Sequence, residues 1–438
     1  MKRLIVATAV LIAILAAAEV GLNRTDGAAG AAPAIAGAPA SADVLARGEY
    51  LTRAADCIAC HTVRESGRPF AGGVAFKLPF GTIYSSNITA DPIHGIGGWS
   101  DDEFVRAVRD GIGKNGEHLY PAFPYTSYTK LSRDDVLAIK AYLHSVPVVD
   151  QANRANDLSF PFNQRWGLAF WKAVFFTDRR FAADAGKPAQ WNSGAYLATA
   201  LGHCGECHTP RNAAFGLEHG KELSGEELQG WRAYNITPDP KYGIGAWSDA
   251  EIAQYLKTGY AAGHAAAGGP MGEAVSHSLQ YLDAADVTAL VVYLRSLPAR
   301  EGAHPVDVNP QRAPALASSD TAPASDTPPG GGDVYRQGLK LFEGACASCH
   351  QWNGKGQQSP YASLVGTRGV SDADGTNVTQ AILLGGKLRI GDSDVFMPAF
   401  GGAYSNTEVA ALANYVIAQF GGKVGKVTPD QVAKRRNL

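Results

Sequence analysis

The sequence predicts an all-α protein built from three tandem domains. Apolar residues recur at helical spacing in many windows, whereas the strict alternation that marks a half-buried strand is nearly absent. Several short motifs occur twice in the same order, which indicates duplicated globular modules. The length of 438 residues, with 45% hydrophobic residues, suits several small domains better than one large domain. A net charge of −2 and no large basic cluster argue against a nucleic-acid partner.

The N-terminus has the shape of a secretory signal. Lys2 and Arg3 precede an uncharged run from Leu4 to Ala18, which closes on three alanines ahead of Glu19. The run is shorter than the roughly 20 residues that a membrane-spanning helix needs, although Val20 and Leu22 extend it. Residues 1–22 are therefore expected to form a signal peptide or an N-terminal membrane anchor. Residues 23–43, rich in Ala, Gly and Pro, predict a linker.

All six cysteines fall in three copies of the pattern Cys-X-X-Cys-His. The copies are Cys57 to His61, Cys204 to His208 and Cys346 to His350. This spacing suits covalent attachment of haem, because two thiols bond the two vinyl groups of one porphyrin and the next histidine is held under the iron. The sequence therefore predicts three haems c, bound by Cys57, Cys60, Cys204, Cys207, Cys346 and Cys349, with His61, His208 and His350 as iron ligands.

Other uses of such cysteines predict features that are missing here. A zinc site needs paired ligand clusters, and a thiol–disulfide redox pair needs no adjacent histidine. Attachment of haem c implies assembly outside the bacterial cytoplasm, so we expect a periplasmic protein.

The first domain is expected at residues 44–150 with the helices of a cytochrome c module. Helical spacing runs from Val44 to Ala55 ahead of the first attachment motif. Two further helices are expected from Ser100 through Val108 and from Ser132 through Leu143, each with serine at its N-cap.

The second domain, placed with a connecting segment at residues 151–300, repeats the first. Ser86-Asn87-Ile88-Thr89 is matched by Tyr234-Asn235-Ile236-Thr237, and the asparagine lies 12 residues before a tryptophan, Trp99 or Trp247, in both. Helices are again expected, at Ser193 to Leu201, Ser248 to Thr258 and Asp283 to Leu297.

The third domain is expected at residues 333–425, after a second linker rich in Pro, Gly and Ser at residues 301–332. Its helices are predicted at Val334 to Phe342 and Ser405 to Phe420. Residues 426–438 form a tail, in which Lys434, Arg435 and Arg436 are expected to fray.

The sixth iron ligand can be sought among very few methionines. A thioether opposite the histidine raises the reduction potential of an electron-transfer haem. Besides Met1 the chain has only Met271 and Met397, and both are expected in the loop ahead of the last helix of their domain. We assign Met271 to the second haem and Met397 to the third.

The first haem has no methionine. Met271 follows Asn235 by 36 residues, and the same count from Asn87 reaches Phe123, which cannot bind iron. This haem is then five-coordinate, or bound by a substitute such as His118 or, less plausibly, His94. A loop histidine without a ligand role remains the plainer interpretation of His118. His203 and His264 are taken as structural.

The paired tryptophans and asparagines leave two interpretations each. Trp99 and Trp247 either direct an indole N–H to a haem propionate or anchor the helix that follows them. Asn87 and Asn235 also fit the glycosylation sequon, which we discount in a bacterial protein.

These motifs, together with Gly48-Glu49-Tyr50-Leu51, the stretch from Gly202 to Asn212 and Met397-Pro398-Ala399-Phe400, resemble the tri-haem cytochrome c subunit of membrane-bound periplasmic dehydrogenases from acetic acid and related bacteria. The resemblance covers nearly everything after Val44. It implies a separate catalytic subunit that oxidises an alcohol, aldehyde, sugar or sugar acid with pyrroloquinoline quinone, FAD or molybdopterin. It also implies electron transfer through the haems to membrane ubiquinone.

Two features depart from the family. Phe123 stands where relatives have methionine, and the chain after Phe420 is shorter than in relatives that carry a C-terminal amphipathic segment. Membrane attachment would then rest on the N-terminal segment or on the partner.

The sequence therefore predicts an electron-transfer subunit without catalytic residues of its own, on the periplasmic side of the inner membrane. One alternative is a multihaem peroxidase that uses an open first haem, which would also need a distal acid–base group. The other is a free periplasmic electron shuttle.

Overall fold

The computed structural model of the chain describes residues 33, 43–64, 66–302, 304–306, 332–356 and 358–437. The expected signal or anchor at 1–22 and most of the two expected linkers lie outside these residues. The chain divides into two compact units, the first made of Met1–Glu206 with Ala213–Leu217 and the second of Cys207–Asn212 with Glu218–Leu438. Each unit is described by itself below.

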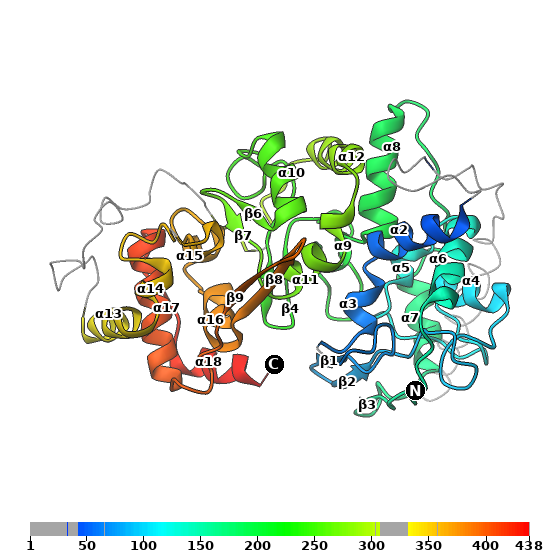
Figure 1. Cartoon of the computed structure of the whole chain (residues 1–438), viewed down its shortest axis with the longest axis horizontal. Coiled ribbons are helices and arrows are strands. Elements are labelled where there is room, and N and C mark those ends of the chain that lie inside the picture. The colour runs from blue at the N-terminus through cyan, green and yellow to red at the C-terminus, as the bar shows by residue number, and fades with distance from the viewer. Residues whose placement is uncertain are drawn as a thin grey trace, which may run out of the picture. The chain divides into compact units, whose positions relative to one another are not determined.

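The first unit consists mainly of short helices (Figure 1, blue to green). Its elements are α2 (Val44–Ala54), α3 (Cys57–His61), β1 (Ala75–Leu78), β2 (Gly81–Tyr84), α4 (Asp101–Asp110), α5 (Tyr125–Tyr128), α6 (Arg133–Ser145), β3 (Asp157–Leu158), α7 (Gly167–Phe175), α8 (Ala189–Tyr196) and the π turn η1 (Leu197–Leu201).

The core of the first unit is the crossing of α2 and α6. Gly48 allows a very close approach, since a Cβ atom there would lie 2.0 Å from the carbonyl oxygen of Ala138. Leu51 and Val136 are fully buried beside this crossing. The helix before the first attachment motif is thereby fixed against the last helix of its domain.

The second unit contains the rest of the expected second domain and the expected third domain, and below these names denote residues 151–300 and 333–425. Its elements are β4 (Glu226–Leu228), β5 (Trp231–Ala233), α10 (Asp249–Thr258), β6 (Tyr260–Ala261), β7 (Ala265–Ala266), α11 (Gly269–His277), the 3-10 turn η2 (Leu279–Tyr281), α12 (Ala284–Arg295), α13 (Asp333–Ala345), α14 (Ala347–His350), the 3-10 turn η5 (Pro360–Ala362), α15 (Arg368–Ser371), α16 (Thr376–Leu384), β8 (Gly386–Ile390), β9 (Ser393–Met397), α17 (Asn406–Gly421) and α18 (Pro429–Arg436).

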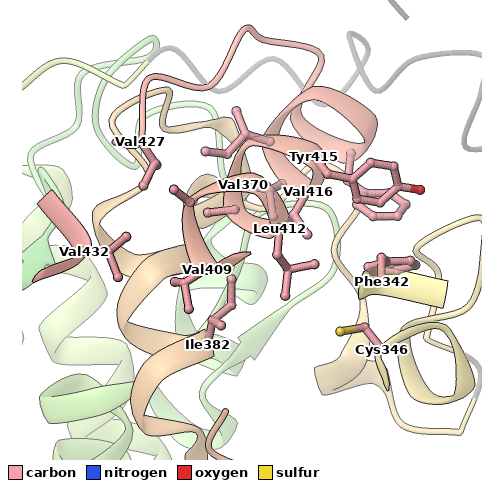
Figure 2. Close-up of a cluster of buried hydrophobic side chains, with 14 of the residues drawn as sticks. Phe342, Cys346, Val370, Ile382, Val409, Leu412, Tyr415, Val416, Val427 and Val432 are labelled. Atoms are coloured by element: carbon pink, nitrogen blue, oxygen red, sulfur yellow. The ribbon is translucent and has the colours of Figure 1, made fainter. Parts of the chain in front are cut away.

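The third domain repeats the close helix crossing of the first. A Cβ atom on Gly338 of α13 would lie 2.4 Å from the carbonyl oxygen of Ala411 in α17. Around this crossing, α13, α16 and α17 bury an apolar cluster that includes Phe342, Ile382 and Leu412 (Figure 2). Tyr415 and Phe342 face each other in it with ring centroids 5.3 Å apart.

The predicted helix starts at Ser100, Ser132, Ser248, Asp283 and Ser405 are confirmed, and their caps explain them. The helix expected from Ser193 instead begins at Ala189. Ser100, Ser248 and Ser405 each accept a hydrogen bond from the backbone of a glutamate three residues later, whose side chain accepts one from the serine backbone. The repeat extends to a cation on the last helix of each of the first two domains. Lys140 bonds the carbonyl of Trp99, and Arg295 that of Trp247.

The structure differs from the all-α expectation by several small sheets. Strand β2 pairs antiparallel with β1 and with β3, and β4–β5, β6–β7 and β8–β9 are antiparallel pairs. Each strand has two to five residues, too few for alternation to show in the sequence. The protein is helix-rich with small sheets rather than all-α.

The expected frayed tail at residues 426–438 is wrong for its last part. Helix α18 begins after Thr428, which forms a capping box with Gln431. Arg435 donates to Glu227 Oε1 and to the carbonyl of Gly230, both at 3.0 Å, so the charged end packs against the second domain's β4–β5 region.

Candidate haem sites

The three attachment motifs have the same local structure. In each, the second cysteine and the histidine lie on a short helix, namely α3, α9 (Gly205–His208) or α14, that follows a longer helical segment. A helical turn places residues three and four positions apart on one face. The two thiols and the histidine of a motif can therefore meet one porphyrin from the same side, and none of the six cysteines forms a disulfide.

The histidines are oriented alike by backbone carbonyls. Nδ1 of His61, His208 and His350 lies 2.7, 2.7 and 2.6 Å from the carbonyl oxygens of Ser86, Tyr234 and Ala362. A carbonyl oxygen only accepts, so Nδ1 carries the proton and Nε2 presents its lone pair. This is the tautomer that an iron ligand requires.

Burial keeps these imidazoles in the neutral form that binds metal. Desolvation lowers the pKa of all three histidines, and the hydrogen bond to the carbonyl opposes this only in part. The positive charge of Arg368 lowers the pKa of His208 further. The residues present thus fit covalent haem with a histidine ligand at each motif.

The two methionines lie on regular elements rather than in the expected loops. Met271 is near the start of α11, and Met397 is the last residue of β9. Each still precedes the final long helix of its domain, α12 or α17. Their position in the chain order of a cytochrome c domain is as predicted, and their role as iron ligands stays a prediction.

The residue count that makes Phe123 equivalent to Met271 in the repeat has a structural counterpart. Ile112 and His118, six residues apart, pair in an antiparallel bridge. Tyr260 and Ala266, also six residues apart, pair in the same way. The spacing from the bridge to Phe123 equals the spacing to Met271. Phe123 itself packs its ring 5.6 Å from that of Tyr128, so it has an apolar contact in this position.

His118 occupies the hairpin rather than the methionine position. It corresponds to Ala266 by the paired register. Its Nδ1 is buried and has no hydrogen-bond partner among the described residues. Burial lowers the pKa of His118, with a smaller effect from the charge of Lys172. His94, the other substitute, lies 3.8 Å from Asp150 through Nε2.

The repeated asparagines have a structural role. Asn87 Oδ1 accepts from both the backbone and the hydroxyl of Thr89, while its Nδ2 donates to the carbonyl of Val149 at 2.7 Å. Asn235 makes the same bonds to Thr237 and the carbonyl of Arg300. Each asparagine is buried. It links two parts of the chain: the residue just before it, whose carbonyl orients the histidine, and the segment that follows the last helix of the domain.

Trp247 and Trp99 differ in their surroundings. Trp247 is 7% exposed and stacks on His264, with ring centroids 4.5 Å apart. Trp99 is half-buried. His264 also pairs with Glu251 at 3.3 Å, which agrees with a structural role for that histidine.

Residues near the first two motifs form contacts that the sequence did not indicate. Glu206, inside the second motif, is buried and accepts from Thr126 Oγ1 at 2.6 Å and from Ser127 Oγ at 2.9 Å. Tyr128 donates to the carbonyl of Ala55 at 2.7 Å and packs edge-on against His203. The one sequence signal that could have revealed these contacts was Glu206, an acidic residue between two attachment cysteines.

Contacts between the second and third domains are also extensive. Gln280 Nε2 donates to the carbonyl of Arg389 at 2.8 Å and its Oε1 accepts from Gly391, which fixes the β8–β9 hairpin to the end of α11. Arg232 of β5 is buried and pairs with Asp372 at 2.7 Å. In the part of the chain that the structure describes, no helix has the length and apolar character needed to cross a membrane.

Comparison with known proteins places these features in context. The cytochrome c family model matches residues 45–147 and 335–418. The chain is 41% identical over 409 residues to the fructose dehydrogenase cytochrome subunit of Gluconobacter japonicus, covering 91% of this chain and 84% of that protein. It is 38% identical over 422 residues to the gluconate 2-dehydrogenase cytochrome c subunit of Pantoea cypripedii, covering 92% of both chains.

The chain is 34% identical over 406 residues to the cytochrome c subunit of alcohol dehydrogenase (quinone) from Gluconobacter oxydans, covering 90% of this chain and 82% of that protein.

Proposed function

The chain belongs to the family of cytochrome c subunits of bacterial dehydrogenases, and we propose from this premise that it carries three haems c and passes electrons from a catalytic dehydrogenase subunit to ubiquinone. It is an electron-transfer subunit and not the catalytic one. The observation that carries the haem count is the shared geometry of the three motifs, each with a histidine whose Nδ1 donates to a backbone carbonyl.

The residues of the chain have distinct tasks in this proposal. A bound haem c supplies the one-electron redox centre, and the paired cysteines hold it covalently. The carbonyls of Ser86, Tyr234 and Ala362 hold the Nδ1 proton of the ligand histidines, so that Nε2 faces the iron. Met271 and Met397 would complete the second and third sites, and Phe123 leaves the first without a thioether.

The acceptor and the cellular site are proposed on two observations. Some relatives are named subunits of alcohol dehydrogenase (quinone), which supports a quinone acceptor. On the first unit, Trp166, Phe170 and Val174 follow one another at intervals of four residues and are 66%, 57% and 73% exposed. This exposed apolar stripe supports attachment to the periplasmic face of the inner membrane.

The catalytic partner is proposed to be a dehydrogenase subunit of the quinoprotein, flavin or molybdopterin type. The relatives' substrates, fructose, gluconate and alcohol, differ, and specificity lies in the catalytic chain. Purification of the native complex, followed by identification of the cofactor that copurifies, distinguishes the three types.

The haem count is tested by pyridine haemochrome analysis and intact mass of the matured protein. Three covalent haems per chain are expected. Fewer than three in fully matured protein would contradict the proposal. The ligands are tested separately by Met271→Ala and Met397→Ala, each of which should lower one reduction potential and slow quinone reduction.

A further inference from the structure

The second and third domains share one buried cation, Arg368. This residue begins α15 in the third domain, yet its backbone N–H donates to the carbonyl of His264 in the second domain at 2.7 Å. Its guanidinium donates to the carbonyl of Asn235 at 3.0 Å and to that of Gly243. The third domain therefore inserts a charged side chain into the second.

The charge of Arg368 has no anionic partner in the described part of the protein. The residue is 4% exposed, and its recorded neighbours are carbonyl oxygens and the rings of Tyr234 and Trp247, whose centroids lie 5.6 and 5.9 Å from Cζ. Its Nε is buried without a hydrogen-bond acceptor. A buried charge that lacks a counter-ion is costly, so an arrangement of this kind calls for an anion.

Arg232, another buried arginine of the same unit, has carboxylate partners. It is also buried between the second and third domains, but it faces the carboxylates of Asp372 at 2.7 Å and Asp374 at 3.4 Å. The contrast shows that the fold supplies carboxylates to one interdomain arginine and none to the other.

The second haem site lies beside Arg368. Tyr234 and Asn235 are consecutive: the carbonyl of Tyr234 accepts from the ligand histidine His208, and the carbonyl of Asn235 accepts from Arg368. The ring of Tyr234 lies under the guanidinium. The unpaired Nε and the aromatic rings therefore lie near the residues that would hold the second haem, and a haem carries two propionate carboxylates.

We propose that Arg368 is a positioning residue for the second haem, supplied by the third domain: its guanidinium pairs with a propionate of that haem and its charge raises the haem's reduction potential. The inference rests on the proposed attachment of a haem at Cys204 and Cys207. A positive charge disfavours ferric iron relative to ferrous iron, so the potential rises with the charge in place. Correct docking of the third domain then sets the potential of the second haem.

The test compares Arg368→Gln, Arg368→Lys and the control Arg232→Gln/Asp372→Asn in the full-length holoprotein. The haem content of the unmodified protein is measured first, because fewer than three haems there would contradict the proposed function rather than this inference. In Arg368→Gln protein that carries three haems, the reduction potential of one haem should fall by at least about 59 mV. This corresponds to a tenfold change in the equilibrium of a one-electron couple. That potential should also become pH-dependent, because an unpaired propionate protonates at higher pH.

The two other variants separate charge from structure. Arg368→Lys keeps the charge but loses the planar fork, so the fall should be smaller than in Arg368→Gln. The double variant Arg232→Gln/Asp372→Asn loosens the same domain contact while removing one positive and one negative charge, so the net charge near the second site stays the same and all three potentials should be unchanged. Unchanged potentials in Arg368→Gln, or an equal fall in Arg232→Gln/Asp372→Asn, would overturn the inference.

A second readout applies if Arg368→Gln does not mature. Redox-difference infrared spectra of protein whose haem carboxylates carry ¹³C report the propionates directly. The isotope-sensitive bands should shift in Arg368→Lys, because an ammonium replaces the guanidinium fork. Bands identical to those of the unmodified protein would overturn the inference.

Discussion

At the scale of single residues, Phe123 sets the first proposed haem site apart from the other two. The paired hairpins put Phe123 at the position of Met271, and its ring already packs on Tyr128. Phenylalanine cannot bind iron, so the first haem loses the thioether that raises a potential. We expect its potential to lie below those of the other two haems and the main electron path to run through them.

Phe123→Met should create a histidine–methionine centre at the first haem. Its potential should rise, and any high-spin signal should disappear, because the iron gains a sixth ligand. Magnetic circular dichroism counts methionine-to-iron charge-transfer bands, and the count should increase from two to three. Three such bands in the unmodified protein would show that the register argument is wrong.

His203 makes stability depend on pH. Burial lowers its pKa below the ordinary value of about 6.5, an effect that the charge of Glu206 partly opposes. The folded protein keeps His203 neutral while the unfolded chain takes up a proton, so the contribution of His203 is complete above about pH 6.5 and is lost as the pH falls below it.

The change that tests this is His203→Phe, which keeps a ring against Tyr128. The midpoint of thermal unfolding should fall less between about pH 7 and 5 in this variant than in the unmodified protein. His219→Phe is the matched control, since His219 is exposed. An identical pH profile for unmodified protein and His203→Phe would contradict the assignment.

At the scale of elements, the sequence predicted those helices whose signals are local. Ser100, Ser248 and Ser405 begin helices because a glutamate three residues later completes each cap. The small sheets could not be predicted in this way, because β2 pairs with β3 more than 70 residues away over only two residues. Helix α18 could have been found from Thr428 and Gln431, whose capping pattern outweighs the charges that follow.

The close crossing of α13 and α17 predicts opposite effects for two glycines of one helix. A Cβ at Gly338 would lie 2.4 Å from the carbonyl oxygen of Ala411, whereas nothing lies within 4 Å of one at Gly344. Gly338→Ala should lower the free energy of unfolding by about 1–3 kcal/mol through overpacking. Gly344→Ala should raise it by about 0.5–1 kcal/mol through helix propensity.

Denaturant unfolding of the holoprotein, followed by circular dichroism, measures both changes. A neutral or stabilising Gly338→Ala would show that the two helices can separate without loss, and the crossing would then not be a determinant of the third domain.

At the scale of the whole molecule, the candidate sites were predictable because covalent attachment of haem needs a contiguous motif. The cysteines and histidines are therefore visible in the sequence alone. Arg368 and Glu206 were not predicted as site residues, because their importance arises from partners more than 70 residues away. The repeat identified Asn87 and Asn235 as equivalent, but only their buried hydrogen bonds revealed what they hold.

The exposed apolar stripe of Trp166, Phe170 and Val174 predicts binding of the protein to lipid. Double replacement of Trp166 and Phe170 by serine should weaken binding to phospholipid vesicles by more than about tenfold, because each aromatic ring contributes about 1.5–3 kcal/mol when buried. Vesicle flotation of the purified full chain measures this. Ile93→Ser is the control, as Ile93 is 80% exposed outside the stripe. Equal flotation of all three proteins would place the attachment elsewhere.

The seating of the β8–β9 hairpin on α11 has a consequence for the speed of electron exchange. Ser276 and Gln280 hold Arg389 and Gly391, so the strand pair that ends in Met397 and the helix that contains Met271 form one hydrogen-bonded support. With Met271 and Met397 as the proposed iron ligands, two haems would share this rigid support, and their bond lengths would change little when an electron arrives or leaves. The reorganisation energy of the pair is then small, and a hop between them needs little thermal activation even when the driving force is close to zero.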